Sequence, residues 1–453
     1  MNFPFVASLG AGQSLADRTR KKISKRILPF VFLLYVIAYL DRANVAFAKL
    51  PMTADLGFSE AIFGFGSGIF FIGYLLLEIP GALIVERWGA RWWMARILIT
   101  WGLCTALIGM IHTPMQFYVA RTLLGIAEGG FFPAIVVYLT HWFRKRDRAR
   151  AMAGFLIASP AALVIGSPIS AYILQFNWFG LAGWRWMFIL EGIPAVVVGI
   201  ITIFYMTDHP RKADWLSPEE QDWITSQLEE ERLQKRASGH LSLWQGLRHR
   251  NVMLLALASC FGNIGIFAFV LWLPTMIQKS SGLSTVLSTA YSALPFACAL
   301  VLIPIISWYS DRTGKRKVCV IGPLIFAATF LALSMIPNQS FAVVFACLCI
   351  AGAFTYSWGP SFWVLPTLIL GETAAAASIG LINIIGNLGS FFGPSIVGAL
   401  LSHGFSLTIV VLFLSSCFLV SAALVSGVFV RPEVALNSDK PQETVRTRQT
   451  TLS

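Results

Sequence analysis

The chain has 453 residues, of which 56% are hydrophobic and only 12% are charged, and its mean hydropathy is +0.71. A typical soluble domain carries about a quarter charged residues, so this composition excludes an ordinary soluble domain and predicts a protein that lies in lipid. A net charge of +12 would fit a nucleic-acid-binding protein, but the positions of the basic residues favour another explanation.

Long apolar segments recur along the whole chain. Each is about 20 to 30 residues long, enough to cross a bilayer with some tilt. A polar central loop at 207–250 separates them into two sets of six, with tails at 1–26 and 431–453. The predicted spans are 27–50, 61–86, 92–111, 115–143, 148–175, 184–206, 251–278, 286–310, 316–336, 340–370, 374–402 and 405–430. The sequence therefore predicts an all-α membrane protein with twelve transmembrane helices, in an N-terminal bundle at 27–206 and a C-terminal bundle at 251–430.

The basic residues are distributed unevenly on this map. Of the 34 Lys and Arg residues, 29 fall in the tails, the central loop and the loops after spans 2, 4 and 8, all on one side. Only Lys49, Arg185 and Lys279 fall on the opposite side. Basic loops stay in the cytoplasm, so we expect both termini to be cytoplasmic. This asymmetry explains the net charge without nucleic acid.

The seven cysteines all lie within predicted spans. They form no CxxC or Cys/His pattern, so we interpret them as small packing residues and predict no metal site. The sequence also shows no nucleotide-binding P-loop and no nucleophile–base arrangement, so we expect neither a cofactor nor enzymatic activity.

A short charged loop occurs once in each half. Residues 86–91 follow span 2, residues 311–316 follow span 8, and the two copies are 225 positions apart. A Gly-x-Pro or Gly-Pro motif in span 5 and span 11 repeats at almost the same offset, which indicates an internal duplication. The residues of the two loops are Glu86, Arg87, Gly89 and Arg91, and Asp311, Arg312, Gly314 and Arg316.

Ionisable residues inside spans are costly in lipid and are therefore candidates for function. Asp41 and Arg42 lie in span 1, and Arg121 and Glu128 lie seven residues apart on span 4, two turns along one helix face. Opposite charges on two helices could neutralise each other across a cavity. A static salt bridge is the structural alternative, but two arginines among titratable carboxylates favour an anionic cargo and a proton.

Other charged positions favour structural interpretations. Glu78 precedes Pro80, and we assign it mainly to the shape of the helix. Glu191 is expected to pair with Arg185 near the membrane surface. The central loop is interpreted as a solvated linker with one surface helix that starts near Ser217.

The two charged loops resemble the signature of the major facilitator superfamily, although Glu86 stands where aspartate is usual. The segments 39–44 and 121–133 resemble the anion:cation symporter family, and residues 358–366 and 383–387 resemble its bacterial tartrate and phthalate branch. This resemblance implies two pseudo-symmetric six-helix bundles, a bacterial inner-membrane location and a latch role for the two charged loops.

The same resemblance assigns residue roles. It implies proton coupling at Asp41 and Glu128 and substrate binding at Arg42, Arg121 and Tyr74. Ser159 occupies the position where galactonate carriers use glutamine, which argues against a polyhydroxylated sugar acid. The C-terminal half offers uncharged candidates for recognising substrate shape; these are Trp272, Tyr356, Asn383 and Asn387.

The predicted function is import of a small organic carboxylate, tartrate-like, phthalate-like or another aromatic or hydroxy acid, by proton symport with alternating access. We expect a monomer in the lipid bilayer that needs no cofactor beyond the proton gradient. An anion exchanger or uniporter is the alternative within transport, and a non-transporting receptor is the alternative outside it.

Overall fold

The computed structural model describes residues 4–144, 147, 151, 157–237 and 249–429. Side chains are described from residue 15 onward, apart from residues 79, 82, 86, 232, 234–237 and 370–377. This part of the chain is helical and contains no β-strand. Its helices fall into two groups with a polar segment between them.

The helices of the first group come from the N-terminal half. They are α1 (Pro4–Leu56), α2 (Glu60–Trp88), α3 (Ala90–Ile108), α4 (Pro114–Glu128), α5 (Phe131–Thr140), α7 (Ala158–Ile173) and α8 (Gly183–Tyr205). A 3₁₀ turn, η1 (Trp178–Gly180), precedes α8, and the polar segment carries η2 (Pro210–Lys212) and α9 (Pro218–Ala237).

The second group comes from the C-terminal half. It consists of α11 (Arg250–Ser281), α12 (Thr285–Tyr291), α13 (Ala293–Thr313), α14 (Val318–Leu333), α15 (Phe341–Ser357), α16 (Gly359–Phe362), α17 (Leu365–Ser402) and α18 (Leu407–Ser426). Every predicted span overlaps at least one of these helices. Among the described residues, nine helices are long and apolar enough to cross a membrane, and two shorter apolar helices accompany them. The predicted all-α membrane fold is confirmed.

The helix boundaries differ from the prediction in several places. Helix α1 begins at Pro4 and not at residue 27, and span 8 is split into α12 and α13. Span 4 is broken into α4 and α5 because Gly130 adopts a left-handed conformation with φ 84°. Span 10 is likewise split into α15 and α16, whereas α17 continues through the turn predicted near Glu372. The domain boundaries drawn from the sequence remain a prediction.

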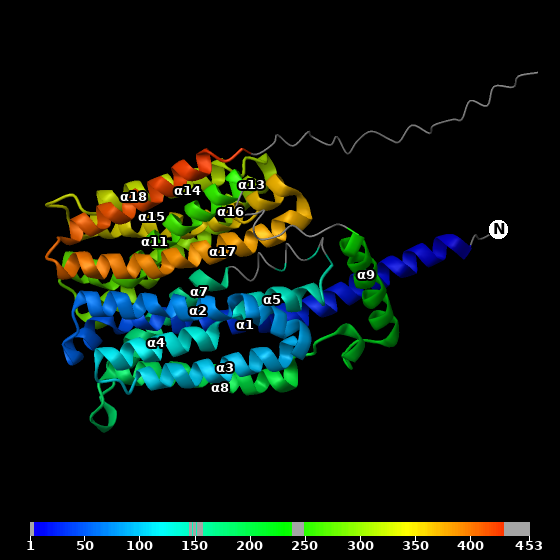
Figure 1. Ribbon diagram of the computed structural model, residues 1–453, viewed down its shortest axis with the longest axis horizontal. Coiled ribbons are helices and arrows are strands. Elements are labelled where there is room, and N and C mark those ends of the chain that lie inside the picture. Colours follow the sequence, from blue (N-terminus) through cyan, green and yellow to red (C-terminus); the bar gives the residue numbers. More distant parts are fainter. Residues whose placement is uncertain (1–3, 145–146, 148–150, 152–156, 238–248, 430–453) are drawn as a thin grey trace, which may run out of the picture.

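The two groups lie side by side as two bundles (Figure 1). Within the first bundle α3 packs on α8 and α2 on α4, and within the second α11 packs on α17 and α13 on α15. Helix α2 also packs on α17, and α7 on α13, which joins the bundles. We call the end of the molecule that carries α9 the α9 end, and the opposite end the far end.

A seam at the far end holds the bundles together. The Lys49 ammonium, on α1, lies 3.0 Å from Glu60 on α2, donates to the Thr275 hydroxyl at 3.1 Å and sits 4.7 Å from the centre of the Trp272 ring. The Trp272 indole N–H donates to Glu60 at 3.1 Å. Lys49 is only 1% exposed, so this far-end seam is closed to solvent at its centre.

Glycines bring α2 and α17 together in the same seam. A Cβ atom on Gly398 would lie 2.4 Å from the Glu60 carbonyl oxygen and 3.0 Å from the Gly64 Cα atom. Such distances are shorter than any side chain allows, so only glycine permits this approach.

The polar segment carries the predicted surface helix, α9, which starts directly after Ser217. It is docked on the first bundle, so the expectation of a solvated linker was wrong. Arg18 and Lys22, on α1, each donate to the Glu220 carboxylate at 3.0 Å, and that side chain is 2% exposed. Burial alone would raise the pKa of Glu220, but hydrogen bonds from the Ser217 backbone and from the two cations lower it overall. The carboxylate therefore stays ionised at neutral pH, and its contribution to docking is lost only as the pH falls through this lowered pKa.

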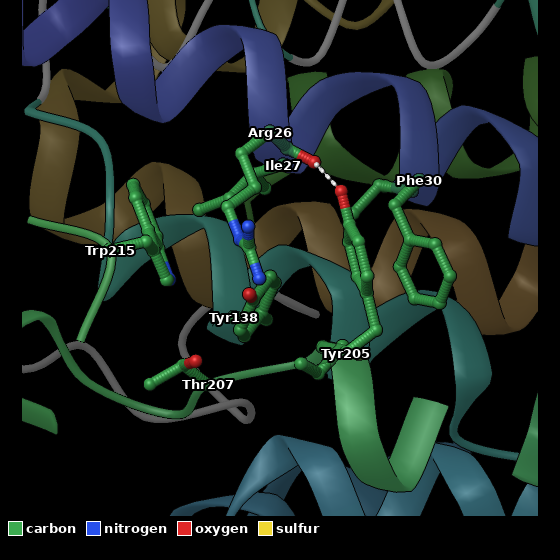
Figure 2. Close-up of a pocket in the computed structure, with 9 residues that line it drawn as sticks. Arg26, Ile27, Phe30, Tyr138, Tyr205, Thr207 and Trp215 are labelled. Carbon is green, nitrogen blue, oxygen red and sulfur yellow. Dashed lines mark hydrogen bonds between the residues drawn. The ribbon is translucent and has the colours of Figure 1, made fainter. Parts of the chain in front are cut away.

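Arg26 makes the second contact of this docked segment. Its guanidinium lies between the rings of Tyr205 and Trp215, 4.8 and 5.1 Å from their centres, and its carbonyl accepts from the Tyr205 hydroxyl at 3.1 Å (Figure 2). These contacts attach the polar segment to α1 and α8 at the α9 end.

Substitution of Gly398 tests the seam. We expect Gly398→Ala to push α17 away from α2, because the added methyl would overlap the Glu60 carbonyl. Overpacking typically costs about 1–3 kcal/mol, which would shift the balance between closed and open far-end states by roughly 5- to 150-fold. The measurement is the rate at which a cysteine at Ala46, in a background without the native cysteines, reacts with an impermeant thiol reagent added on the far-end side.

Gly380→Ala is the matched control. It makes the same change on the same helix, and a Cβ atom there would meet no atom of the described residues within 4 Å. Equal labelling rates in the two variants would contradict the role of the seam.

Candidate functional site

The predicted charges of span 1 and span 4 meet in a buried ion pair. Arg42, on α1, donates to Glu128 Oε1 through Nη2 at 2.5 Å and through Nε at 2.6 Å. The Glu128 side chain is fully buried, and Arg42 is 14% exposed. Glu128 is the last residue of α4, so the break at Gly129 and Gly130 leaves its carboxylate at a helix end beside α1.

Aromatic rings surround the Arg42 guanidinium. It lies 5.0 Å from the centre of the Tyr74 ring, 5.6 Å from Tyr39 and 5.8 Å from Phe70. Ring faces attract a cation and exclude water, so this guanidinium is held by one carboxylate and by π electrons. Tyr74 therefore contacts the predicted substrate arginine.

Arg121 is buried and only partly bonded. Its Nε and Nη2 atoms donate to the carbonyls of Gly66 and Ser67 at 3.4 and 3.2 Å, and its guanidinium lies 4.8 Å from the Phe70 ring. The side chain is 2% exposed, and its Nη1 atom has no hydrogen-bond partner within the described part of the chain. An unmatched cationic donor at this depth is costly unless an anion reaches it.

Both arginines line one cavity between the bundles. Its other walls are Ser67 and apolar residues from α1, α2, α11 and α17, namely Val45, Ala46, Phe70, Phe71, Phe267, Val270, Leu271 and Pro394. A small anion with an apolar or aromatic body matches two guanidinium groups on otherwise apolar walls.

Asp41 is not among the residues that line this cavity, although it precedes Arg42. Its side chain is 3% exposed, and its Oδ1 atom accepts from the Asn44 amide at 3.5 Å. It interacts with Arg121 and Glu128 and faces Thr105 and Trp101 on α3. The four charged residues predicted from spans 1 and 4 thus form one cluster.

The remaining predicted residues lie at different places. Ser159 is 8% exposed and bonds to Tyr39 beside the arginine. Tyr356 packs edge-on against Phe296 and interacts with Tyr39 across the bundles. Trp272 lies in the far-end seam rather than among the cavity walls.

Asn383 and Asn387 bind a carboxylate of the protein itself. Both amides are on α17 and donate to the Glu78 carboxylate on α2. The Asn387 amide lies 3.3 Å from it, and the Asn383 amide lies closer. The i, i+4 spacing of the two asparagines indicated donors to a carboxylate or an interhelical packing bond as the alternative to substrate binding. Sequence reasoning assigned Glu78 to helix shape and did not name it as the acceptor.

The two predicted latch loops lie at the α9 end. In the first loop Gly89 has φ 86°, and the Arg91 backbone N–H donates to Asp208 at 2.9 Å. Arg87 is exposed, and the Glu86 side chain lies outside the described residues. Asp208, which the sequence did not single out, is the acceptor there.

In the second loop Gly314 has φ 68° and ends α13. Arg316 pairs with Asp311 and donates to Ser310 at 3.2 Å, whereas Arg312 stacks on Trp308. In the part of the chain that the structure describes, no group of three or more His, Cys, Asp or Glu residues could hold a metal ion.

Two helical bundles, a cavity between them and buried charges facing that cavity define a membrane transporter. The model of the Major Facilitator Superfamily matches residues 31–394 and 292–451, and the chain belongs to this superfamily. It is therefore a multi-pass membrane transporter and not an enzyme.

Similar proteins include a "Putative tartrate transporter" of Agrobacterium vitis, 43% identical over 385 residues, which cover 85% of this chain and 88% of that protein. A "Quinolone resistance transporter" of Acinetobacter baumannii is 34% identical over 417 residues, which cover 91% and 95%. The inward open conformation of the xylose transporter XylE from E. coli matches with a TM-score of 0.72 at 17% identity and covers 90% of this chain and 97% of that one. This last likeness shows the fold alone.

A double-mutant cycle tests the tie between α2 and α17. We expect Glu78→Ala and Asn387→Ala each to lower the thermal stability of the detergent-solubilised protein, because each removes hydrogen bonding between the buried Glu78 carboxylate and α17. Their effects should be non-additive by about 1.5–3 kcal/mol, the range for hydrogen bonds to charged groups. Glu78→Ala combined with Asn251→Ala, whose amide donates to the Phe429 carbonyl, is the control and should be additive. Additivity of the Glu78 and Asn387 changes would argue against the tie.

Proposed function

We propose that this transporter imports a small organic carboxylate together with at least one proton. The observation that carries the proposal is the unpartnered Nη1 of Arg121, which is buried in the wall of a cavity that also holds the Arg42–Glu128 pair. A carboxylate entering this cavity meets one free guanidinium donor and a second guanidinium already held by a titratable acid.

The pair supplies a means of coupling. When the cargo carboxylate binds Arg42, it competes with Glu128 for the same donors. An ionised Glu128 without that partner is costly in a water-poor site, so it takes up a proton. Cargo binding and proton binding then favour each other, and this linkage is reciprocal.

The name of the Agrobacterium vitis relative supports a dicarboxylate such as tartrate. The apolar and aromatic cavity walls favour a cargo with an aromatic or apolar body, whereas hydroxyl-binding side chains on them are few. Both kinds of cargo are carboxylates, and the charge recognition proposed here is common to both.

Alternating access in this proposal places the far end outside the cell and the α9 end in the cytoplasm. The far-end seam then closes the outer entrance, and the loops that carry Arg87 and Arg312 act as latches on the cytoplasmic face. The 29 basic residues on the predicted cytoplasmic side support this orientation.

Paired transport assays test the coupling residues. We expect Asp41→Asn and Glu128→Gln to abolish accumulation driven by a proton gradient while retaining part of the exchange of labelled substrate at equal pH. Arg42→Ala and Arg121→Ala should lose both activities, because a substrate carboxylate would be stranded without a cation. The measurement uses proteoliposomes and a panel of labelled tartrate and aromatic carboxylates.

Glu219→Gln, a carboxylate-to-amide change on the exposed surface of α9, is the control and should behave as the wild type. If Asp41→Asn and Glu128→Gln both still concentrate substrate against its gradient, these residues do not couple transport, and an exchanger or uniporter becomes the better interpretation.

Single cysteines test the orientation. A cysteine at Glu219, on α9, should react with an impermeant reagent only from the cytoplasmic side. One at Lys279, near the far end of α11, should react only from outside. Reaction of both from the same side of intact cells would contradict the membrane map.

A further inference from the structure

A second polar cluster lies inside the first bundle, apart from the arginine cavity. It is enclosed by α1, α3, α7 and α8, and its carboxylates are Asp41 on α1 and Glu191 on α8. Asn44 lies between them: its amide is 3.5 Å from Asp41 Oδ1, and it also interacts with Glu191. The Ser170 hydroxyl, on α7, donates to Glu191 Oε1 at 2.7 Å.

The sequence interpretation of Glu191 was wrong. Its expected partner, Arg185, instead bonds Asp55 at 3.4 Å and the carbonyls of Gly109 and Ile111 at 3.1 and 2.8 Å. Glu191 is thus left to neutral donors and to Asp41.

Several buried polar atoms converge on this cluster without partners. Within the described residues, Asp41 Oδ2, Asn44 Oδ1 and Glu191 Oε2 accept no hydrogen bond. The Trp101 indole and Thr105 hydroxyl, both fully buried, face the Asp41 carboxyl group and have no other partner among the residues that the structure describes. Unmatched polar atoms are rare in protein interiors, and several of them together indicate a site that binds something small and polar.

The charges around the cluster define what that ligand is. Asp41 faces Glu191 from α1, Cys104 of α3 faces Asp41, and Arg121 and Glu128 face Asp41 from α4. Arg42 is paired with Glu128, so Arg121 alone balances the two carboxylates Asp41 and Glu191. Glu78, a further carboxylate of this bundle, is bound by the amides of α17. Neutrality therefore requires one additional positive charge, and the smallest such ligand is a proton.

We propose that Asp41 and Glu191, bridged by Asn44, form a second proton-binding site that holds one proton in the substrate-free protein. The proton is bound as an O–H on one carboxyl group. It passes to the other when that O–H bond breaks and an O–H bond forms on the second carboxylate, which leaves the first ionised. This inference rests on the proposed proton coupling and extends it, because the proton at Asp41 and Glu191 is separate from the one that Glu128 takes up when cargo binds.

The first test is the pH profile of uptake. Glu191→Gln cannot lose a proton, so we expect its uptake to persist to higher pH, with the alkaline midpoint displaced by about one pH unit, the size of a typical environmental change in a carboxyl group. Glu191→Asp should restore the wild-type profile, and Glu219→Gln should match it. A merely structural role for Glu191 would lower expression or thermal stability and leave the midpoint in place; an unchanged midpoint in a folded Glu191→Gln protein overturns the proposal.

The second test needs no transport. The infrared band of a protonated carboxylic acid should be present in the substrate-free wild type at neutral pH and should lose intensity in Glu191→Gln. Persistence of the full band overturns the proposal even if Glu128 proves to couple transport. If instead the wild type carries this band but fails to accumulate any carboxylate, the proposed function fails and the proton site stands.

Measuring uptake with and without sodium shows whether the cluster binds a proton or another small cation. Uptake by the wild type in choline buffer without sodium should equal uptake in sodium buffer. A sodium requirement that disappears in Glu191→Gln would assign the cluster to a metal cation and overturn the proposal.

Discussion

The contact between Arg42 and Glu128 is the interaction on which the site depends. A guanidinium and a carboxylate at membrane depth are each costly alone, and together they are tolerated because each cancels the charge of the other. This mutual dependence makes the pair responsive: whatever replaces one partner changes the protonation or the position of the other. The aromatic rings of Tyr39, Phe70 and Tyr74 surround the Arg42 guanidinium and exclude water that would otherwise solvate it.

The fold positions this pair through glycine. Gly129 and Gly130 end α4 directly after Glu128, so the carboxylate lies at a break between two helices instead of in a continuous helix. A Cβ atom on Gly125, one turn earlier, would lie 2.0 Å from the Phe70 carbonyl, which shows how closely α4 approaches α2. Close approach of α2 and α4 places Arg121 beside the carbonyls of Gly66 and Ser67, whose oxygens accept two of its donors.

The sequence predicted the helices and the residues of this cluster because the cost of a charge in lipid is visible from one position alone. The hydrogen-bond and ion-pair partners of these charged residues could not be predicted in the same way, since they depend on packing between distant segments. Glu191 pairs with Ser170 and not with Arg185, Glu78 pairs with Asn387 in the other bundle, and Lys49 is enclosed by Glu60 and Trp272. The hydropathy and charge patterns are local, whereas these contacts join segments up to 309 positions apart.

The division of polar groups between the bundles constrains how transport works. The α17 partners of Glu78 are amides, which do not titrate, whereas Asp41, Glu78, Glu128 and Glu191 all belong to the first bundle. Under the proposed coupling, the proton carried with the cargo is held by the first bundle while the second moves relative to it. Because Glu78 accepts hydrogen bonds from the amides of Asn383 and Asn387, these amides are not free to bind a cargo. A cargo that binds those amides must first release Glu78, so binding at this point loosens the contact between α2 and α17 that the opening of the cavity requires.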